Sequence, residues 1–215
     1  MFLGIGYFGI YFDDLTLLTY TYIYMSAKDT IITLPNTKLR QRSVKVGFIG
    51  DEVKQLVTDM EAATLDWEDN REHELGVALA AVQIAELKRV VVIREDFENK
   101  KNRNFTVFIN PEITKLEGDI VEDYEGCLSI KDIYGKVPRY NKVKVKALDI
   151  NGNEFRVTAE GFLARIFQHE IDHTNGKVFI DHIQDKPEAF FKLDTDGHLI
   201  KLDYEKEIHE NSLLW

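Results

Sequence analysis

Two stretches of the chain carry apolar residues at helical spacing. In residues 51–65 apolar positions recur every three or four residues, with acids and a lysine between them, which predicts an amphipathic helix. The acidic residues 66–74 that follow predict a loop. The helical period returns in residues 159–174, where Thr158 is the expected N-cap and Gly176 belongs to the expected C-terminal stop.

Other stretches have the patterns of strands. Residues 89–94 and 105–109 are short and mostly apolar, as buried strands are, and Asn110-Pro111 is expected to end the second of them. Residues 143–148 alternate between apolar and polar positions, which is typical of a half-exposed strand. Asn-Gly at the start of residues 151–157 predicts a tight hairpin into the next strand.

The order of these elements predicts an α+β fold, with antiparallel strands and hairpins around a late, central helix. We expect one main domain over residues 25–185 and a polar C-terminal tail over residues 186–215. Residues 1–24 are apolar and lack the basic start of a secretory signal. We expect them to be either a poorly ordered extension or a segment that precedes the true start at Met25.

Composition narrows the class of protein. The chain has 215 residues, of which 44% are hydrophobic and 30% charged, which suits a folded globular domain. Its formal net charge of −10 disfavours direct DNA binding, because nucleic acids select basic surfaces. A single cysteine excludes an intrachain disulfide, and we expect no membrane segment because no apolar stretch reaches about 20 residues.

The strongest chemical signal lies within the second predicted helix. His169 and His173 are four positions apart, so they share one helix face and can reach one metal ion. Phe162 and Ile166 fall on the same face, which predicts a partly dry site. Glu170 is rotated by about 100° around the helix, and is better placed to hold a metal-bound water than to ligate the metal.

Such a pair of histidines needs a third ligand. The spacing used by metzincins puts Phe179 at that position, and a phenyl ring cannot bind a metal. A downstream carboxylate such as Glu188 is one candidate, although nothing specific surrounds it. The other candidate is Cys127, whose thiolate with two imidazoles would leave a fourth position open for water.

Three short motifs of this chain resemble those of the peptide deformylase family. Residues 125–129 read EGCLS and residues 168–173 read QHEIDH, and both match the family's motifs without a break. Residues 76–83 read GVALAAVQ, where the family has GxGxAAxQ, so Ala78 replaces the second glycine. Residues 32–41 resemble the family's N-terminal start, and the resemblance extends over about residues 28–183.

The resemblance implies a metal centre and a role for each motif. The implied metal ligands are Cys127, His169 and His173. The implied ion is divalent, with Fe²⁺ expected and Zn²⁺, Ni²⁺ or Co²⁺ able to occupy the site, because this ligand set suits several metals. Glu170 is implied as the base that takes the proton of the attacking water. The side chain of Gln83 and the backbone N–H of Leu128 are implied to stabilise the oxyanion.

Other residues are expected to shape substrate binding. By family analogy Gly76 lines the site, and Gly126 permits close backbone approach beside the ligand. Ala78 puts substrate affinity in doubt if its position requires a positive φ or contacts the substrate backbone. We expect Glu125 and Gln168 to support the ligands and Asp172 to make a structural hydrogen bond. Candidates for the apolar pocket are Ile130, Tyr134, Phe162 and Ile166.

The activity implied by the resemblance is removal of the formyl group from the N-terminal methionine of new proteins. The expected substrates are N-formylmethionyl peptides, the ribosome is a candidate partner, and we expect a cytoplasmic monomer. Two alternatives stay open at the level of sequence. One is a zinc peptidase that cleaves internal amide bonds without using Cys127, and the other is a catalytically weakened metal-binding paralogue, which Ala78 alone favours.

Overall fold

The computed structural model describes residues 31–71 and 74–209, and the expected extension over residues 1–24 lies outside them. In the described part, seven strands form one antiparallel sheet in the order β1-β2-β3-β4-β6-β7, and β5 also pairs with β4. The strands are β1 (Ala78–Ala80), β2 (Val90–Arg94), β3 (Phe105–Cys127), β4 (Ile130–Leu148), β5 (Glu154–Glu160), β6 (Phe190–Leu193) and β7 (Leu199–Lys201).

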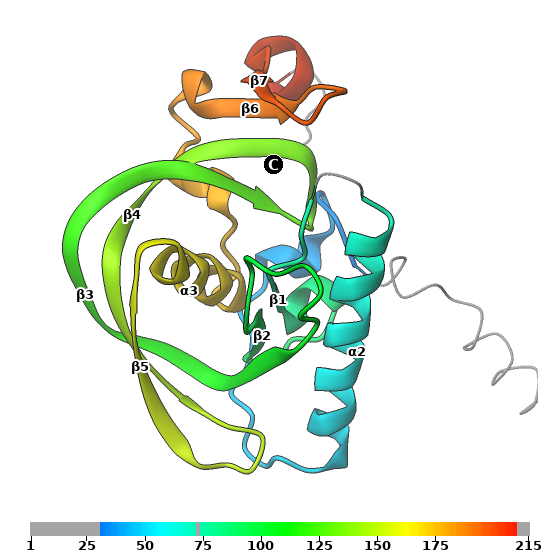
Figure 1. Cartoon of the computed structure of the whole chain (residues 1–215), viewed down its shortest axis with the longest axis vertical. Helices are drawn as coiled ribbons and strands as arrows, with labels where there is room; N and C mark the ends of the chain where they lie inside the picture. Colours follow the sequence, from blue (N-terminus) through cyan, green and yellow to red (C-terminus); the bar gives the residue numbers. More distant parts are fainter. Residues whose placement is uncertain (1–30, 72–73, 210–215) are drawn as a thin grey trace, which may run out of the picture.

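Two α-helices and several short turns complete the described chain. Helix α2 (Asp51–Asp69) lies beside the sheet, whereas the long curved strands β3 and β4 wrap around α3 (Gly161–Thr174) (Figure 1). The 3₁₀ turns are η2 (Thr37–Arg40), η3 (Ala81–Ile84), η4 (Phe179–His182) and η5 (Pro187–Ala189), and a π-helical turn forms η6 (Glu205–His209). Over these residues no helix has the length and apolar character needed to cross a membrane.

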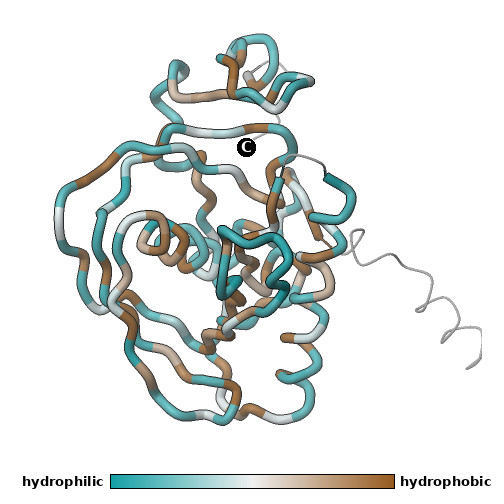
Figure 2. Tube along the Cα trace, in the orientation of Figure 1, coloured by the Kyte–Doolittle hydropathy of each residue, from teal (hydrophilic) through white to brown (hydrophobic). Residues whose placement is uncertain are grey.

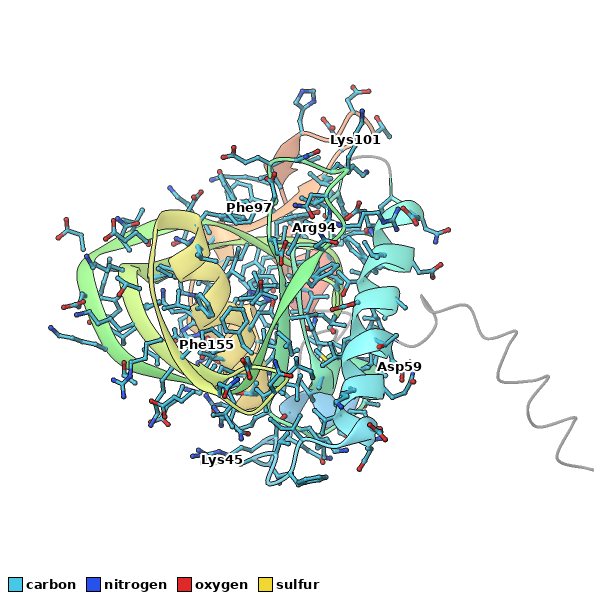
Figure 3. All side chains as sticks on the ribbon, turned by 60° about the horizontal axis from the view of Figure 1, so that its bottom comes forward. Lys45, Asp59, Arg94, Phe97, Lys101 and Phe155 are labelled. Atoms are coloured by element: carbon cyan, nitrogen blue, oxygen red, sulfur yellow. The ribbon has the colours of Figure 1, made fainter. Side chains whose placement is uncertain are left out.

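Strand β2 shows how the two helices share one sheet. Its residues alternate between the two faces, as side chains of a strand must. Val91 and Ile93 pack into the core with α3, while Val90 and Val92 pack into the core with α2. Figure 2 shows alternating hydrophilic and hydrophobic segments along α2, and in Figure 3 Asp59 points outward from that helix. One hydrophobic strand therefore holds both helices in place.

The expected α+β fold is confirmed, and so is the hairpin at Asn151-Gly152, where Gly152 has a φ of 85°. Helix α2 is longer than expected and takes in the first residues of the predicted acidic loop. Helix α3 begins two residues later than expected, because β5 continues through Thr158 and Ala159 and leaves Glu160 as the N-cap. Phe155 of β5 packs inward against the core that contains α3 (Figure 3).

The predicted strand end at Asn110-Pro111 is wrong. Strand β3 continues through both residues and pairs with β4 over most of its length. Asn110 has a φ of 53°, and the pairing register shifts between Ile109 and Glu112. Such a bulge accommodates a proline, which has no N–H to donate to the neighbouring strand. The continuation matters because the far end of β3 carries Cys127.

The segment expected as a polar tail is built into the sheet where the structure describes it. Strand β6 pairs with β4 at Tyr134 and Gly135, and β7 pairs with β6. Phe190, the first residue of β6, is fully buried. It belongs with Leu202 and Ile208 to a hydrophobic core distinct from the cores that contain α2 and α3. Figure 1 shows β6 and β7 beyond the outer edge of β4.

Candidate metal centre

The end of β3 and one face of α3 meet at a cluster of three soft ligands. Cys127 is the last residue of β3, where the pairing register with β4 shifts, and it is 8% exposed. His169 and His173 lie one turn apart on α3 and point to the same place. The ligand atoms of the three residues all lie within 4.8 Å of one another.

The distances between these atoms fit one tetrahedral ion. The Sγ atom of Cys127 lies 3.2 Å from Nε2 of His173, which is 3.2 Å from Nε2 of His169. Bonds of about 2.0–2.3 Å at tetrahedral angles require ligand separations of about 3.3–3.6 Å. A divalent ion therefore fits with little movement, and one thiolate with two imidazoles leaves its fourth position open.

A buried carboxylate orients the first histidine. Nδ1 of His169 lies 2.9 Å from Glu125, which also accepts hydrogen bonds from Arg139 and Arg165. Burial would raise the pKa of Glu125, but His169 and Arg139 together hold that pKa well below its usual value. The carboxylate therefore stays ionised and keeps Nε2 of His169 directed at the metal position, as carboxylates behind metal-bound histidines do.

The two imidazoles differ in how readily they bind a proton. Burial would lower the pKa of His169, but Cys127 and Glu125 raise it well above its usual value. Burial and the charge of His169 hold the pKa of His173 well below its usual value. Histidine ligates a metal in its neutral form, and the surroundings of His173 favour that form.

Glu170 has the surroundings expected of a general base. Its side chain is buried beside the pocket, and its Oε2 atom has no hydrogen-bond partner. Burial is the main cause that raises the pKa of Glu170 to about 7. A carboxyl group with a pKa near neutrality can take and return a proton at physiological pH.

Gln83 points a donor at the same place. It belongs to η3, it is 1% exposed, and its Oε1 accepts a hydrogen bond from the backbone of Ala80. This fixes the amide so that Nε2 lies 3.6 Å from Sγ of Cys127 and 3.2 Å from Oγ of Ser129. Leu128 lies in the turn after Cys127 and lines the same pocket, and the role of its N–H stays a prediction.

Of the three expected substrate-binding residues, two line the pocket and the third does not. Ala78 and Gly126 line the pocket, and Ala78 has extended backbone in β1, so its position does not require glycine. Gly126 lies under the ring of Tyr134, where a Cβ would come within 2.6 Å of a ring carbon. Gly76 packs against α2, because a Cβ there would lie 2.8 Å from the carbonyl oxygen of Thr64. Its part in substrate binding stays a prediction.

A pocket of about 420 Å³ opens beside the ligands and Glu170. The four expected apolar residues all line it, which are Ile130, Tyr134, Phe162 and Ile166. Phe162 is 48% exposed, so the buried stripe predicted on α3 begins only at Ile166. In the same lining, the guanidinium of Arg71 lies 4.4 Å from the ring centre of Trp67, and Tyr134 donates a hydrogen bond to Glu74.

Sequence reasoning did not find the two arginines that hold Glu125. Arg139 and Arg165 lie in β4 and α3, outside the three motifs, and both are nearly buried. Arg139 also pairs with Asp172, which therefore makes the structural contact expected of it. A buried arginine within a helix of mostly apolar residues was the one available signal, because such a charge requires a buried acidic partner.

Comparisons with known proteins agree with this site. The family model for polypeptide deformylase matches residues 28–189. The peptide deformylase of Thermomicrobium roseum is 42% identical over 160 residues, which are 73% of this chain and 86% of the relative. A peptide deformylase of Clostridium perfringens is 46% identical over 144 residues, which are 67% of this chain and 90% of the relative.

Solved structures give the same result. The crystal structure of a peptide deformylase from Synechococcus elongatus with actinonin has a TM-score of 0.66 and 35% identity, and covers 73% of this chain and 80% of that one. A Met-Ala-Ser-bound peptide deformylase from Acinetobacter baumannii has a TM-score of 0.63 and 33% identity, and the match covers 71% of this chain and 96% of that one. The matches span the cysteine and both histidines, and this chain belongs to the peptide deformylase family.

Proposed function

We propose that this protein is a metal-dependent hydrolase that removes the formyl group from the N-terminal methionine of newly made proteins and releases formate. The observation that carries the proposal is the convergence of Cys127, His169 and His173 beside the unpaired carboxylate of Glu170. Its membership of the deformylase family supports the choice of reaction. We propose Fe²⁺ as the ion, with Zn²⁺, Ni²⁺ and Co²⁺ as metals that the same ligands accept.

An ion held by Cys127, His169 and His173 would supply Lewis acidity to the attacking water and to the formyl carbonyl. Glu170 takes one proton from the attacking water, because its carboxylate lies in the pocket without another partner. The water oxygen bonds to the formyl carbon, and the C–N bond then breaks as Glu170 passes the proton to the leaving nitrogen. The products are formate and a free N-terminal amine.

Two donors serve the oxygen that gains negative charge during attack. We assign this role to Nε2 of Gln83, which lies 3.6 Å from Sγ of Cys127, and to the backbone N–H of Leu128, the next residue after that cysteine in the pocket lining. Gln83 costs little reorganisation, because Ala80 already fixes its amide. Each such donor typically contributes a few kcal/mol to the stability of the transition state.

We propose that the methionine side chain enters the apolar part of the pocket, beside Ile130 and Ile166. The Met-Ala-Ser peptide bound to the Acinetobacter baumannii relative supports a substrate of this kind. We further propose that the protein acts as a monomer in the cytoplasm on chains that leave the ribosome, since formylated N-termini arise there. Ribosome binding is testable by cosedimentation with purified ribosomes.

The test of the proposed function uses formyl-Met-Ala peptide and measures formate. We expect Glu170→Ala to lower kcat by about 10²–10⁴-fold while the metal content is unchanged. Cys127→Ala is expected to lose both metal and activity. Retention of full formate release by Cys127→Ala would exclude thiolate ligation, and cleavage of an internal amide bond by that variant would favour the zinc peptidase.

A further inference from the structure

The pocket is wider than the metal centre and has a second wall. Beyond the ligands and Glu170 it is lined by Leu193, Gly197 and Leu199, which belong to the β6–β7 hairpin. All three follow residue 189, where the match to the family model ends. A volume of about 420 Å³ lies in the range of pockets that enclose drug-sized ligands, so it has room for more than one side chain.

Strand register places this wall relative to the metal ligands. Gly126, next to Cys127, is paired with Tyr134 of β4, and Tyr134 is paired with Phe191 of β6. Directly paired residues point to the same face of a sheet, and so do residues two apart along a strand. Leu193 therefore lies on the face of Gly126 and Tyr134, and its partner Leu199 lies beside it.

The order of the strands also gives the approximate distance between the β6–β7 hairpin and β3, which carries Cys127. The step from β3 to β4 and the step from β4 to β6 are each about 4.8 Å, so the hairpin begins roughly 10 Å from the strand that carries the cysteine. An extended peptide advances about 3.3 Å per residue, so roughly three residues span that distance. A peptide whose formyl carbon is at the metal centre, about one step before its first residue, therefore reaches the hairpin near its third residue.

The hairpin is held firmly enough to act as a binding wall. Phe190, at the start of β6, is fully buried, and its ring packs against Tyr204 at a centroid distance of 5.0 Å. The ring of Phe191 meets Tyr124 of β3 edge-on, also at 5.0 Å. Lys192 forms an ion pair of 2.7 Å with Glu207 of η6. These contacts tie the hairpin to the strand of the metal ligand and to the C-terminal turn.

We infer that the β6–β7 hairpin is a specificity element that selects an apolar side chain at about the third position of the formylated peptide. The inference rests on the proposed function and adds a second recognition point to it. The apolar preference follows from the two leucines and the glycine that face the pocket. Asp194 and Asp196 of the hairpin do not line it, and Asp194 accepts backbone hydrogen bonds within its own turn.

The test measures kcat/KM on formyl-Met-Ala-X peptides, where X is Leu, Ser or Asp, and on formyl-Met-Ala. For the unaltered protein we expect X = Leu to exceed X = Asp by about 3–10-fold, the effect of burying one or two methylene groups. Leu193→Ala and Leu199→Ala are each expected to reduce this ratio toward one. Ile200→Ala is the matched control, because Ile200 is the next residue of β7, 41% exposed and outside the pocket lining.

A second variant tests for a gain of preference. Leu199→Lys places a cation on the wall and is expected to reverse the ratio, so that X = Asp exceeds X = Leu. Equal values for all X in the unaltered protein, or the same ratio in both leucine variants as in Ile200→Ala, would overturn the inference. Absence of formate release from formyl-Met-Ala by the metal-loaded unaltered protein would instead overturn the proposed function. Circular dichroism spectra that match the unaltered protein confirm that each variant is folded.

Discussion

Helices α2 and α3 have the same amphipathic period but different tasks. Helix α2 lies beside the sheet with a solvent-facing side, whereas α3 is enclosed by β3, β4 and β5 (Figure 1). Each buries a glutamate. Glu68 of α2 is paired with Arg94 and accepts a hydrogen bond from the backbone of Gly76, while Oε2 of Glu170 in α3 has no partner.

The two glutamates differ in role: a paired one supports neighbouring structure, whereas an unpaired one is available for a reaction. A buried charge with partners holds other groups in place, and Glu68 holds the segment that leads to Gln83. A buried carboxylate without a partner is costly, and such groups persist where a reaction uses them. Comparing the two helices therefore supports the proposed role of Glu170 without reference to any motif.

The largest expected effect comes from removing a ligand from α3. His173→Ala is expected to lower kcat/KM by at least about 10³-fold and to abolish stoichiometric metal binding, because two ligands rarely hold a divalent ion. Metal analysis of the purified protein and formate release measure the two effects. Thr64→Ala removes a buried side chain from α2 and is the control. If it also lost metal, the division between the helices would be wrong.

Breaking the buried pair of α2 is expected to act on stability. Arg94→Met leaves the carboxylate of Glu68 buried without its cation, which should cost about 3–5 kcal/mol in the free energy of unfolding. Urea denaturation measures the change. The double variant Glu68→Gln with Arg94→Met removes both charges and is expected to recover part of the loss. A single variant as stable as the unaltered protein would contradict this account.

The unpaired carboxylate of α3 should carry a stability cost that depends on pH. In the folded metal-free protein the pKa of Glu170 is raised from 4.5 to about 7, so folding retains a proton that the unfolded chain releases. The contribution of protonated Glu170 to the free energy of unfolding is therefore lost as pH rises from 4.5 to about 7. Glu170→Gln is expected to be more stable by about 3 kcal/mol at pH 8, a difference that disappears below pH 4.5. Urea denaturation after chelation tests this.

The smallest effect is expected at an exposed pair near the end of α2. Asp69 and Arg103 lie 2.7 Å apart, but both side chains are about half exposed to solvent. Because water and salt screen such pairs, Arg103→Ala is expected to leave the thermal midpoint and the activity unchanged. A clear loss of stability would mean that α2 depends on its surface charges as well as on Arg94.

Local patterns in the sequence predicted the helices and the β4–β5 hairpin well. The apolar period of α2 and the Asn151-Gly152 turn act over short distances, so the residues alone identify them. The continuation of β3 past Pro111 was missed because it depends on a bulge that only pairing with β4 creates. Strands β6 and β7 are short, and their place is set by non-local pairing at Tyr134.

The metal ligands of the site were predictable from the sequence, whereas the residues that support them were less so. The two histidines follow from helical spacing, Cys127 was one of two candidates for the third ligand, and the resemblance selected it and brought in Gln83. The arginines around Glu125 come from β4 and α3, and no local pattern joins residues 14 and 40 positions away from that glutamate. The hairpin wall at Leu193 and Leu199 was not expected either, because a polar segment gave no sign of facing the pocket.

The position of Trp67 makes the pocket observable by light. Its indole ring lines the pocket and lies 4.4 Å from the guanidinium of Arg71, and the chain contains only two tryptophans. Indole emission responds to the polarity around the ring, so a compound that displaces water there alters the fluorescence signal. With Trp215 replaced by phenylalanine, the remaining emission comes from one ring, and inhibitor titrations become possible without any added dye.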